Sequence, residues 1–194
     1  YAGYLACQMG LPITQLVIAT NANDILHRCI SNNQYAKQAL VKTYSPSMDI
    51  MVSSNFERLL FDLYDRDGAA LSQCMTRLSK DKVHALDPQR WHRARQLFDS
   101  CRVSDIETCD MIREVSQQYR YLLDPHSAIG VKAARQCRRN TQTPMITMAT
   151  AHPVKFPAAV VKSGCQQPAM PDHMADLFEQ PESYQVFDND LTAI

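Results

Sequence analysis

The sequence lacks the short motifs that identify a catalytic or nucleotide-binding site most directly. It contains no GxSxG, Walker loop, GxGxxG or HExxH, which argues against the common hydrolase, nucleotide-binding and zinc-protease classes. It also has no apolar run of membrane length and no signal-like segment, and its formal net charge is +0. Neither nucleic acid nor a membrane is therefore an expected partner.

Cysteine pairs at metal-binding spacing are also missing. The seven cysteines are odd in number and widely scattered, with no CxxC pair, which argues against a disulfide framework or a metal site. Hydrophobic residues make up 45% of the chain and charged residues 21%, so we expect a globular protein in the reducing cytoplasm, with cysteines that fill the core.

Two apolar runs with β-branched residues are present, at 16–20 and 145–150. Both are typical of strands buried in a parallel sheet, and helical patterns lie between and around them. The predicted fold class is α/β, with few parallel strands and many flanking helices. A doubly wound sheet usually has about five or six strands, so we expect the sheet to be incomplete and residues 1–194 to be a portion of a larger domain.

Helix starts and local packing are marked by particular residues. The polar region 69–103 is predicted to be a peripheral helical insertion, Gly130 predicts close packing within a helix, and 184–187 predicts an edge strand. The expected helix starts are Ser54 with Glu57, Asp87 with Pro88, Ser104 with Glu107, and Asp124 with Pro125.

Polar residues follow both expected strands. In open parallel sheets, ligands bind beyond the carboxyl ends of the strands, so the candidate ligand-binding groups are those of Asn21, Asn23, Asp24, Thr147, Thr150 and His152. The alternative is that the asparagines cap the next helix and Thr150 forms a turn. The favoured role of His126 and His152 is structural, Lys155 is expected to be solvated, and the cluster Arg135, Arg138 and Arg139 is expected to complement a helix C-terminus.

Five stretches, in this order and spacing, resemble the C-terminal half of threonine synthase. They are YAGYLACQMGLP, ATNANDIL, SPSMDIMVSSNFERLLFDL, YLLDPHSAIGVKAAR and MATAHPVKFPAAV. The SPSMDI turn with SSNFERLL, and the ATAHPVKF turn, are specific to that family within the fold type II enzymes that use pyridoxal 5'-phosphate (PLP). The resemblance covers nearly the whole chain and implies the C-terminal part of a type II PLP-enzyme fold.

The resemblance implies conversion of O-phosphohomoserine and water to L-threonine and phosphate through an aldimine of PLP. In the family, the Schiff-base lysine and the phosphate loop precede a segment similar to Tyr1–Tyr4. We therefore expect both of them upstream, an N-terminal half of the same polypeptide as the partner, and no activity from this chain alone. The alternative hypothesis is a catalytically silent interaction or regulatory module of the same fold, for which self-association would be the natural role.

The resemblance also assigns candidate site residues. It places the Thr150 hydroxyl on the pyridine nitrogen of PLP, and it assigns no catalytic residue and no metal ligand to this chain. The candidate residues on the substrate side are Asn21, Asn23, Asp24, Ser45, Ser47, Asp49, Asn55, Arg58, His152 and Lys155.

Overall fold

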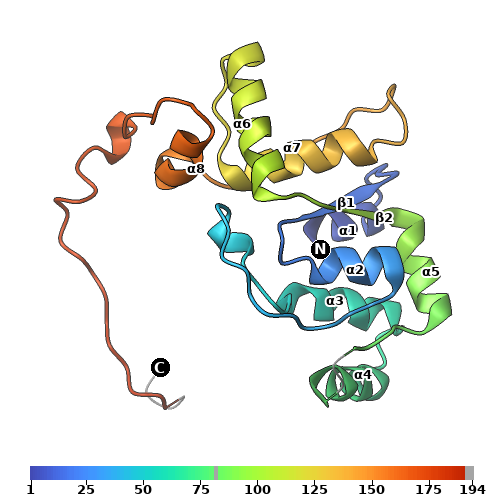
Figure 1. Cartoon of the computed structure of the whole chain (residues 1–194). Helices are drawn as coiled ribbons and strands as arrows, with labels where there is room; N and C mark the ends of the chain where they lie inside the picture. Colours follow the sequence, from blue (N-terminus) through green and yellow to red (C-terminus); the bar gives the residue numbers. More distant parts are fainter. Residues whose placement is uncertain (81–82, 191–194) are drawn as a thin grey trace.

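The computed structural model describes residues 1–80 and 83–190 and has helices layered around a small parallel sheet (Figure 1). Its elements in chain order are α1 (Ala2–Gln8), β1 (Leu16–Thr20), α2 (Ile25–Asn32), the 3-10 turn η1 (Pro46–Met48), α3 (Ser54–Leu63), α4 (Gly68–Lys80), α5 (Pro88–Leu97), β2 (Phe98–Arg102), α6 (Asp105–Tyr119), α7 (Pro125–Cys137), η2 (Pro153–Lys155), α8 (Pro157–Lys162) and η3 (Asp172–Met174).

The sheet of the described residues consists of β1 and β2, which pair in parallel from Leu16 opposite Phe98 to Thr20 opposite Arg102. Helix α7 packs on one face and α2 on the other, as Figure 1 shows. Parallel strands need a long crossover connection, and here residues 21–97 form it. The predicted α/β class, with few parallel strands and many flanking helices, is confirmed.

The crossover region forms the larger apolar core, which lies beneath the sheet in Figure 1. Leu60, Ile30 and Phe56 are among its buried residues, from α3 and α2. The indole nitrogen of Trp91 in α5 donates to the carbonyl oxygens of Cys29 and Ile30 at 2.9 and 3.0 Å. Helix α5 is thereby held against the last turn of α2, so that the chain enters β2 directly beside β1.

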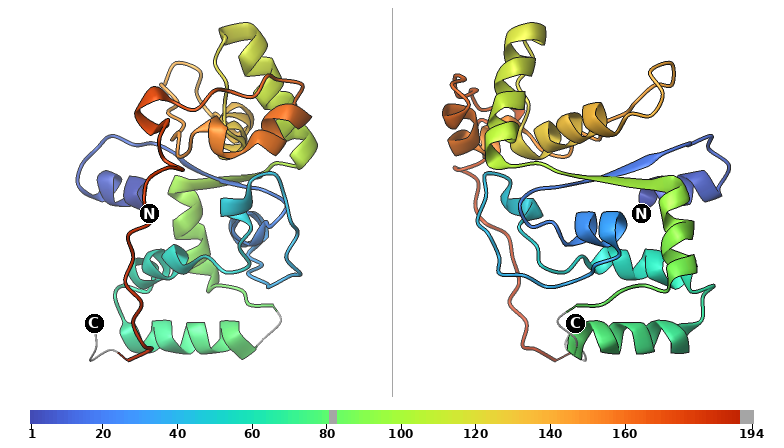
Figure 2. Two further views of the ribbon diagram at one scale, coloured as in Figure 1. Left: turned by 90° about the vertical axis from the view of Figure 1, so that its left-hand side faces the viewer. Right: turned by 45° about the vertical axis from the view of Figure 1, so that its right-hand side comes forward.

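The second layer consists of α6, α7 and α8 on the opposite face of the sheet (Figure 2). Helix α6 starts at a reciprocal capping box between Ser104 and Glu107, and α7 starts at Asp124, whose carboxylate accepts from the next backbone amides. The predicted starts at Asp87, Ser104 and Asp124 are confirmed. The capping box predicted at Ser54 is wrong, because α3 is preceded by Ser53, whose side chain makes no capping bond.

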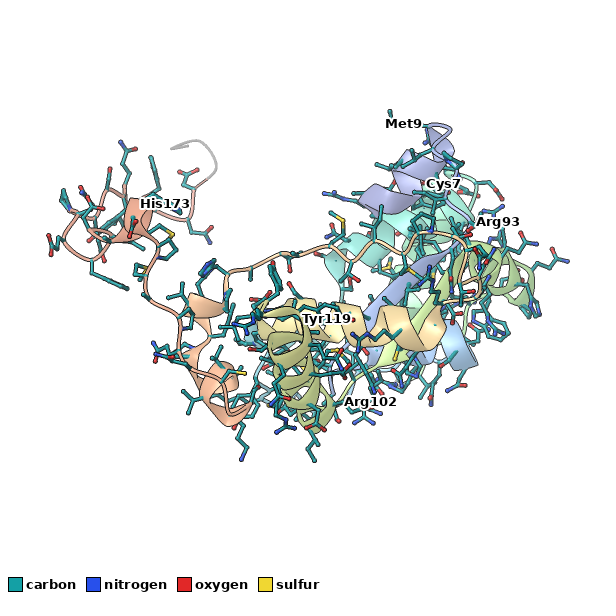
Figure 3. All side chains as sticks on the ribbon, turned by 90° about the horizontal axis from the view of Figure 1, so that it is seen from above. Cys7, Met9, Arg93, Arg102, Tyr119 and His173 are labelled. Atoms are coloured by element: carbon teal, nitrogen blue, oxygen red, sulfur yellow. The ribbon has the colours of Figure 1, made fainter. Side chains whose placement is uncertain are left out.

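The last described segment, residues 166–190, extends away from the helical body, and His173 marks its separation in Figure 3. Phe178 and Val186 are each 85% exposed. The edge strand predicted at 184–187 is wrong, because those residues have no strand partner among the described residues.

The buried strand predicted at 145–150 is also wrong. Residues 145–150 form an extended, non-strand segment in which Ile146 and Met148 are 81% and 74% exposed. The second strand is β2, at the end of the region 69–103 that was predicted to be helical. Helices α4 and α5 occupy most of that region, and the hypothesis that it is a peripheral insertion stays a prediction.

The capping box of α6 generates a test of stability. We expect Ser104→Ala to lower the free energy of unfolding by about 1 kcal/mol, because a capping hydroxyl lost from a helix start costs about that much. Ser53→Ala is the matched control and should have little effect. Urea unfolding followed by circular dichroism measures both, and equal effects of the two variants would contradict the assignment.

The same capping box predicts a pH dependence. The backbone amide and hydroxyl of Ser104 lower the pKa of Glu107 below its ordinary 4.5. A lowered folded-state pKa means that the stabilising contribution is complete above pH 4.5 and is lost as the pH falls through the lowered value. In Glu107→Gln, this part of the acid dependence of unfolding should be missing.

Gly130 tests the placement of the 145–150 segment on α7. A Cβ at this position would lie 2.7 Å from Cγ2 of Thr147, so the predicted close packing is confirmed. We expect Gly130→Ala to destabilise the protein by about 1 kcal/mol, since overpacking outweighs the gain in helix propensity. In a Thr147→Ser background, which removes the methyl group, the same change should stabilise by up to about 1 kcal/mol. Destabilisation in both backgrounds would place the segment elsewhere.

Candidate functional site

Four predicted substrate-side residues come together just beyond the end of β1. The side-chain nitrogens of Asn21 and Asn23 donate to Asp49 Oδ1 at 2.8 and 2.9 Å. Thr43 adds its hydroxyl to the same oxygen at 2.7 Å and its backbone amide to Oδ2 at 3.0 Å. Asn21 also donates to the Ser45 hydroxyl at 3.0 Å. We call Asn21, Asn23, Thr43, Ser45 and Asp49 the Asp49 network.

The Asp49 network is satisfied internally. Asn21 is 1% exposed and Ser45 is fully buried, and the Asp49 carboxylate accepts four hydrogen bonds from neutral donors. Buried polar groups need such partners. The asparagines therefore hold the 41–49 loop onto the strand end. They do not cap α2, whose first residue is preceded by Asp24 without a side-chain cap bond.

Asp24 has a different role from the asparagines. Its Oδ1 lies 2.7 Å from Nε of Arg28, and its Oδ2 lies 3.6 Å from Nε of Arg102. The pair with Arg28 is half-buried and joins consecutive turns of α2, while Arg102 comes from the end of β2. Asp24 thus links the beginning of α2 to the sheet.

Ser47 is tied to α7 through His126. The backbone amide of Ser47 donates to Nε2 of His126 at 3.2 Å, and Nδ1 of His126 lies 2.9 Å from Oδ1 of Asp124. Asp124 is 1% exposed and also caps the helix. The side chain of His126 lies edge-on against Phe156 with ring centroids 4.6 Å apart. The predicted structural role of His126 agrees with these contacts.

A pocket of about 450 Å³ opens between β1, α7 and the 145–150 segment. Its walls are mostly apolar, and Thr150, Ser47 and His126 contribute polar groups. We call it the strand-end pocket. Thr150 is exposed in this chain, at the rim of that pocket. The pocket therefore brings Thr147 and Thr150 beside Val17 and Ala19 of β1. The polar residues that follow β1, and His152, do not line it, and 145–150 is not a strand.

A second pocket of about 530 Å³ lies on the other side of the η1 turn, and we call it the lysine pocket. Lys42, Tyr44 and Asp105 line it together with Lys155 and Phe156. Lys155 is exposed, as expected, and neither lysine forms an ion pair with another residue in the described part of the chain. Nearby, Nδ1 of His152 accepts from the Val154 amide at 3.2 Å and thereby caps η2.

The predicted residues Asn55 and Arg58 line neither pocket and lie outside the Asp49 network. Asn55 and Arg58 are exposed on α3, which packs with α4 and α5 beneath the sheet. The basic cluster at the end of α7 is also separate from them. Arg135 pairs with Glu114, Arg139 pairs with Asp99, and Arg138 binds the carbonyl oxygens of residues 140, 141 and 143. Arg135 lies in the last turn of α7, which agrees with the expected position at a helix C-terminus.

Burial makes the thiols of Cys29 and Cys137 poor nucleophiles. Burial raises the pKa of Cys29 to about 12 and that of Cys137 to about 11, so both are protonated thiols at neutral pH. Cys101 and Cys137 pack in the small apolar cluster between β2 and α7. No group of residues suited to hold a metal ion is found in residues 1–80 and 83–190. Within the same residues, no helix is both long and apolar enough to cross a membrane.

The sequence missed Thr43, Lys42 and the link between His126 and Ser47. Thr43 stands in a polar stretch without periodicity, so no local signal marks it. The sequence predicts Asp124 as a helix start, but the Asp124 carboxylate also orients the imidazole ring of His126. The consequence of that orientation, a hydrogen bond from Ser47 to His126, is visible only in the tertiary structure.

The chain is similar to known proteins along its whole length. Residues 127–194 match the family model described as "Threonine synthase, C-terminal". The threonine synthase of Pseudomonas aeruginosa is 55% identical over 195 aligned residues, which cover 100% of this chain and 42% of that protein. The chain thus spans less than half the length of this curated relative.

Solved structures give the same result. The structure of PLP-bound threonine synthase from Brucella melitensis has a TM-score of 0.88 and 45% identity, covering 98% of this chain and 41% of that one. The yeast threonine synthase structure has a TM-score of 0.84 and 33% identity, covering 93% and 40%. Sequence and fold agree along nearly the whole chain, and the chain therefore belongs to the threonine synthase family, to whose C-terminal portion it corresponds.

Proposed function

We propose that the full-length protein containing this chain is a threonine synthase that uses PLP to convert O-phosphohomoserine and water to L-threonine and phosphate. The observation that supports this most strongly is the strand-end pocket. It brings Thr150, the one residue assigned to the cofactor, beside the end of β1, in a chain similar to threonine synthases throughout its length.

The strand-end pocket fits a flat heteroaromatic cofactor. Its volume of about 450 Å³ lies within the range of small-molecule sites, which are mostly apolar with a few convergent polar groups. Val17, Ala19 and Met48 supply apolar walls, and Thr150 supplies a hydroxyl. When bound, PLP provides an electron sink for carbanions next to the amino-acid nitrogen.

In this proposal, Thr150 would hold the ring nitrogen with a neutral hydroxyl group. A hydroxyl can donate or accept a hydrogen bond, so it orients the ring without requiring a protonated nitrogen, as a carboxylate partner would. Val17 and Ala19 keep water from one side of the ring. The contribution of this chain is thus to bind, orient and exclude water.

The lysine pocket supports an anionic substrate. Lys42 and Lys155 line it without an ion pair among the described residues, and the neighbouring carboxylate, Asp105, accepts the Tyr44 amide at 3.3 Å. Point charges on flexible stems suit a phosphate group. Because η1 and the adjoining loop line both pockets, a substrate phosphate in the lysine pocket would place its carbon chain toward the strand-end pocket.

The proposed partner of this chain is the rest of the same polypeptide. The Pseudomonas aeruginosa relative extends well beyond the part that this chain covers, and we place the Schiff-base lysine and the phosphate loop there. The same part would complete the sheet beside the two strands of this chain and cover Ile146 and Met148.

The second candidate function is a catalytically silent interaction module. The strong exposure of Ile146 and Met148 beside the strand-end pocket favours it, because large apolar side chains that lie together on a surface are typical of an interaction site. The two candidates differ in whether the full-length protein binds PLP and turns over substrate.

Our proposal predicts that this chain alone does not bind PLP covalently. After incubation with PLP and reduction with borohydride, intact-mass analysis should show no adduct above the level of a Lys155→Met control. The full-length protein should carry one PLP per chain and show a visible absorption band. A stoichiometric adduct of this chain that disappears in Lys155→Met would instead make Lys155 the cofactor lysine.

The role of Thr150 is tested in the full-length protein. Thr150→Val keeps the shape of the side chain but removes the hydroxyl, so we expect PLP affinity to fall about tenfold, the equivalent of one lost hydrogen bond. Thr150→Ser retains the hydroxyl and should stay within about twofold of the original protein. Absorbance titration with PLP measures both, and equal affinities of the valine and serine variants would contradict the role.

A further inference from the structure

His126 occupies a buried position that joins two parts of the strand-end pocket. It is 8% exposed at the first turn of α7 and lies among the residues that line the pocket. Its ring makes a hydrogen bond on each nitrogen, to Asp124 through Nδ1 and to the Ser47 amide through Nε2.

These two contacts fix the tautomer of the ring. A backbone amide can only donate, so Nε2 must carry a lone pair and the proton must lie on Nδ1, where it is donated to Asp124. Asp124 is itself fixed, because its carboxylate also accepts from the amides of His126 and Ser127 and from the Ser127 hydroxyl. The imidazole is therefore held in one orientation.

The hydrogen bond from Ser47 connects His126 to η1. The residues of η1 and its neighbour Ser45 stand between the two pockets, with Pro46 lining the lysine pocket and Ser47 and Met48 lining the strand-end pocket. The Asp49 network holds this loop from the β1 side. The bond from Ser47 to His126 holds it from the α7 side at 3.2 Å.

From this geometry we infer that His126 is a positioning residue, which acts through the backbone of Ser47 to hold η1 as a wall of the cofactor pocket. The inference rests on the proposed function in that it takes the strand-end pocket as the PLP site. Asp124 serves as the orienting partner that keeps the acceptor nitrogen of His126 toward Ser47. A histidine ring keeps a fixed orientation when a second residue accepts the hydrogen bond from its other nitrogen.

Two substitutions of His126 test the hydrogen bonds of its two ring nitrogens separately. Asparagine places its amide near the position of Nδ1, so His126→Asn keeps a donor for Asp124 and loses the acceptor for Ser47. Glutamine reaches the position of Nε2, so His126→Gln keeps the acceptor. His92→Asn is the matched control, because His92 is exposed on α5 and lines neither pocket.

The experiment uses the full-length protein and two measurements. Hydrogen exchange followed by mass spectrometry reports on the peptide that spans residues 43–49, first without PLP. We expect His126→Asn to speed its exchange about tenfold, while His126→Gln and His92→Asn leave it unchanged. PLP titration should then show an affinity about tenfold lower in His126→Asn, and an affinity that is partly or fully restored in His126→Gln.

The outcomes distinguish this inference from the proposed function. If the peptide is protected equally in all variants, or if His126→Gln is as defective as His126→Asn, the positioning role is overturned. If exchange responds as expected but the unaltered protein binds no PLP, the link to a cofactor is overturned while the contact itself stands. Selective ¹⁵N labelling of histidine adds a measurement that needs no variant, in which a proton on Nε2 of His126 would also overturn the inference.

Discussion

The carboxylate of Asp49 is the interaction on which the site depends. It accepts four hydrogen bonds, from Asn21, Asn23 and both the hydroxyl and the amide of Thr43, and so binds the 41–49 loop to the end of β1. Asp49 is half-buried, and these donors replace the water that its carboxylate gives up. Because the loop carries η1, which lines both pockets, the position of the whole site follows from these bonds.

The Asp49 network in turn requires β1 to be placed by the sheet. Pairing with β2 satisfies the backbone along one edge of β1, and α2 and α7 cover its two faces. The Trp91 contact holds α5 where its last residue leads directly into β2. The second tie to the loop comes from α7 through His126. The loop thus lies between two elements that are themselves fixed by the same two strands.

The two errors in strand placement have one physical cause. Residues 145–150 have the local pattern of a buried strand, but a strand also needs a neighbour for its backbone groups, and within the described residues they have none. In β2, by contrast, Asp99 and Ser100 look unfavourable for a buried strand. Their side chains find partners in Gln15, Arg139 and His27, and these contacts cannot be seen in the local sequence.

The sequence by itself determined β1, the α/β class, three of the helix starts, the close packing at Gly130 and the resemblance to threonine synthases, because each depends on local patterns or on ordered motifs. The resemblance also included Asn21, Asn23, Ser45 and Asp49 among ten candidate residues on the substrate side. Only the tertiary structure decided that these four bind one another, that Asn55 and Arg58 lie apart, and that His126 holds Ser47. Those facts depend on contacts between residues far apart in the chain, which local propensity does not encode.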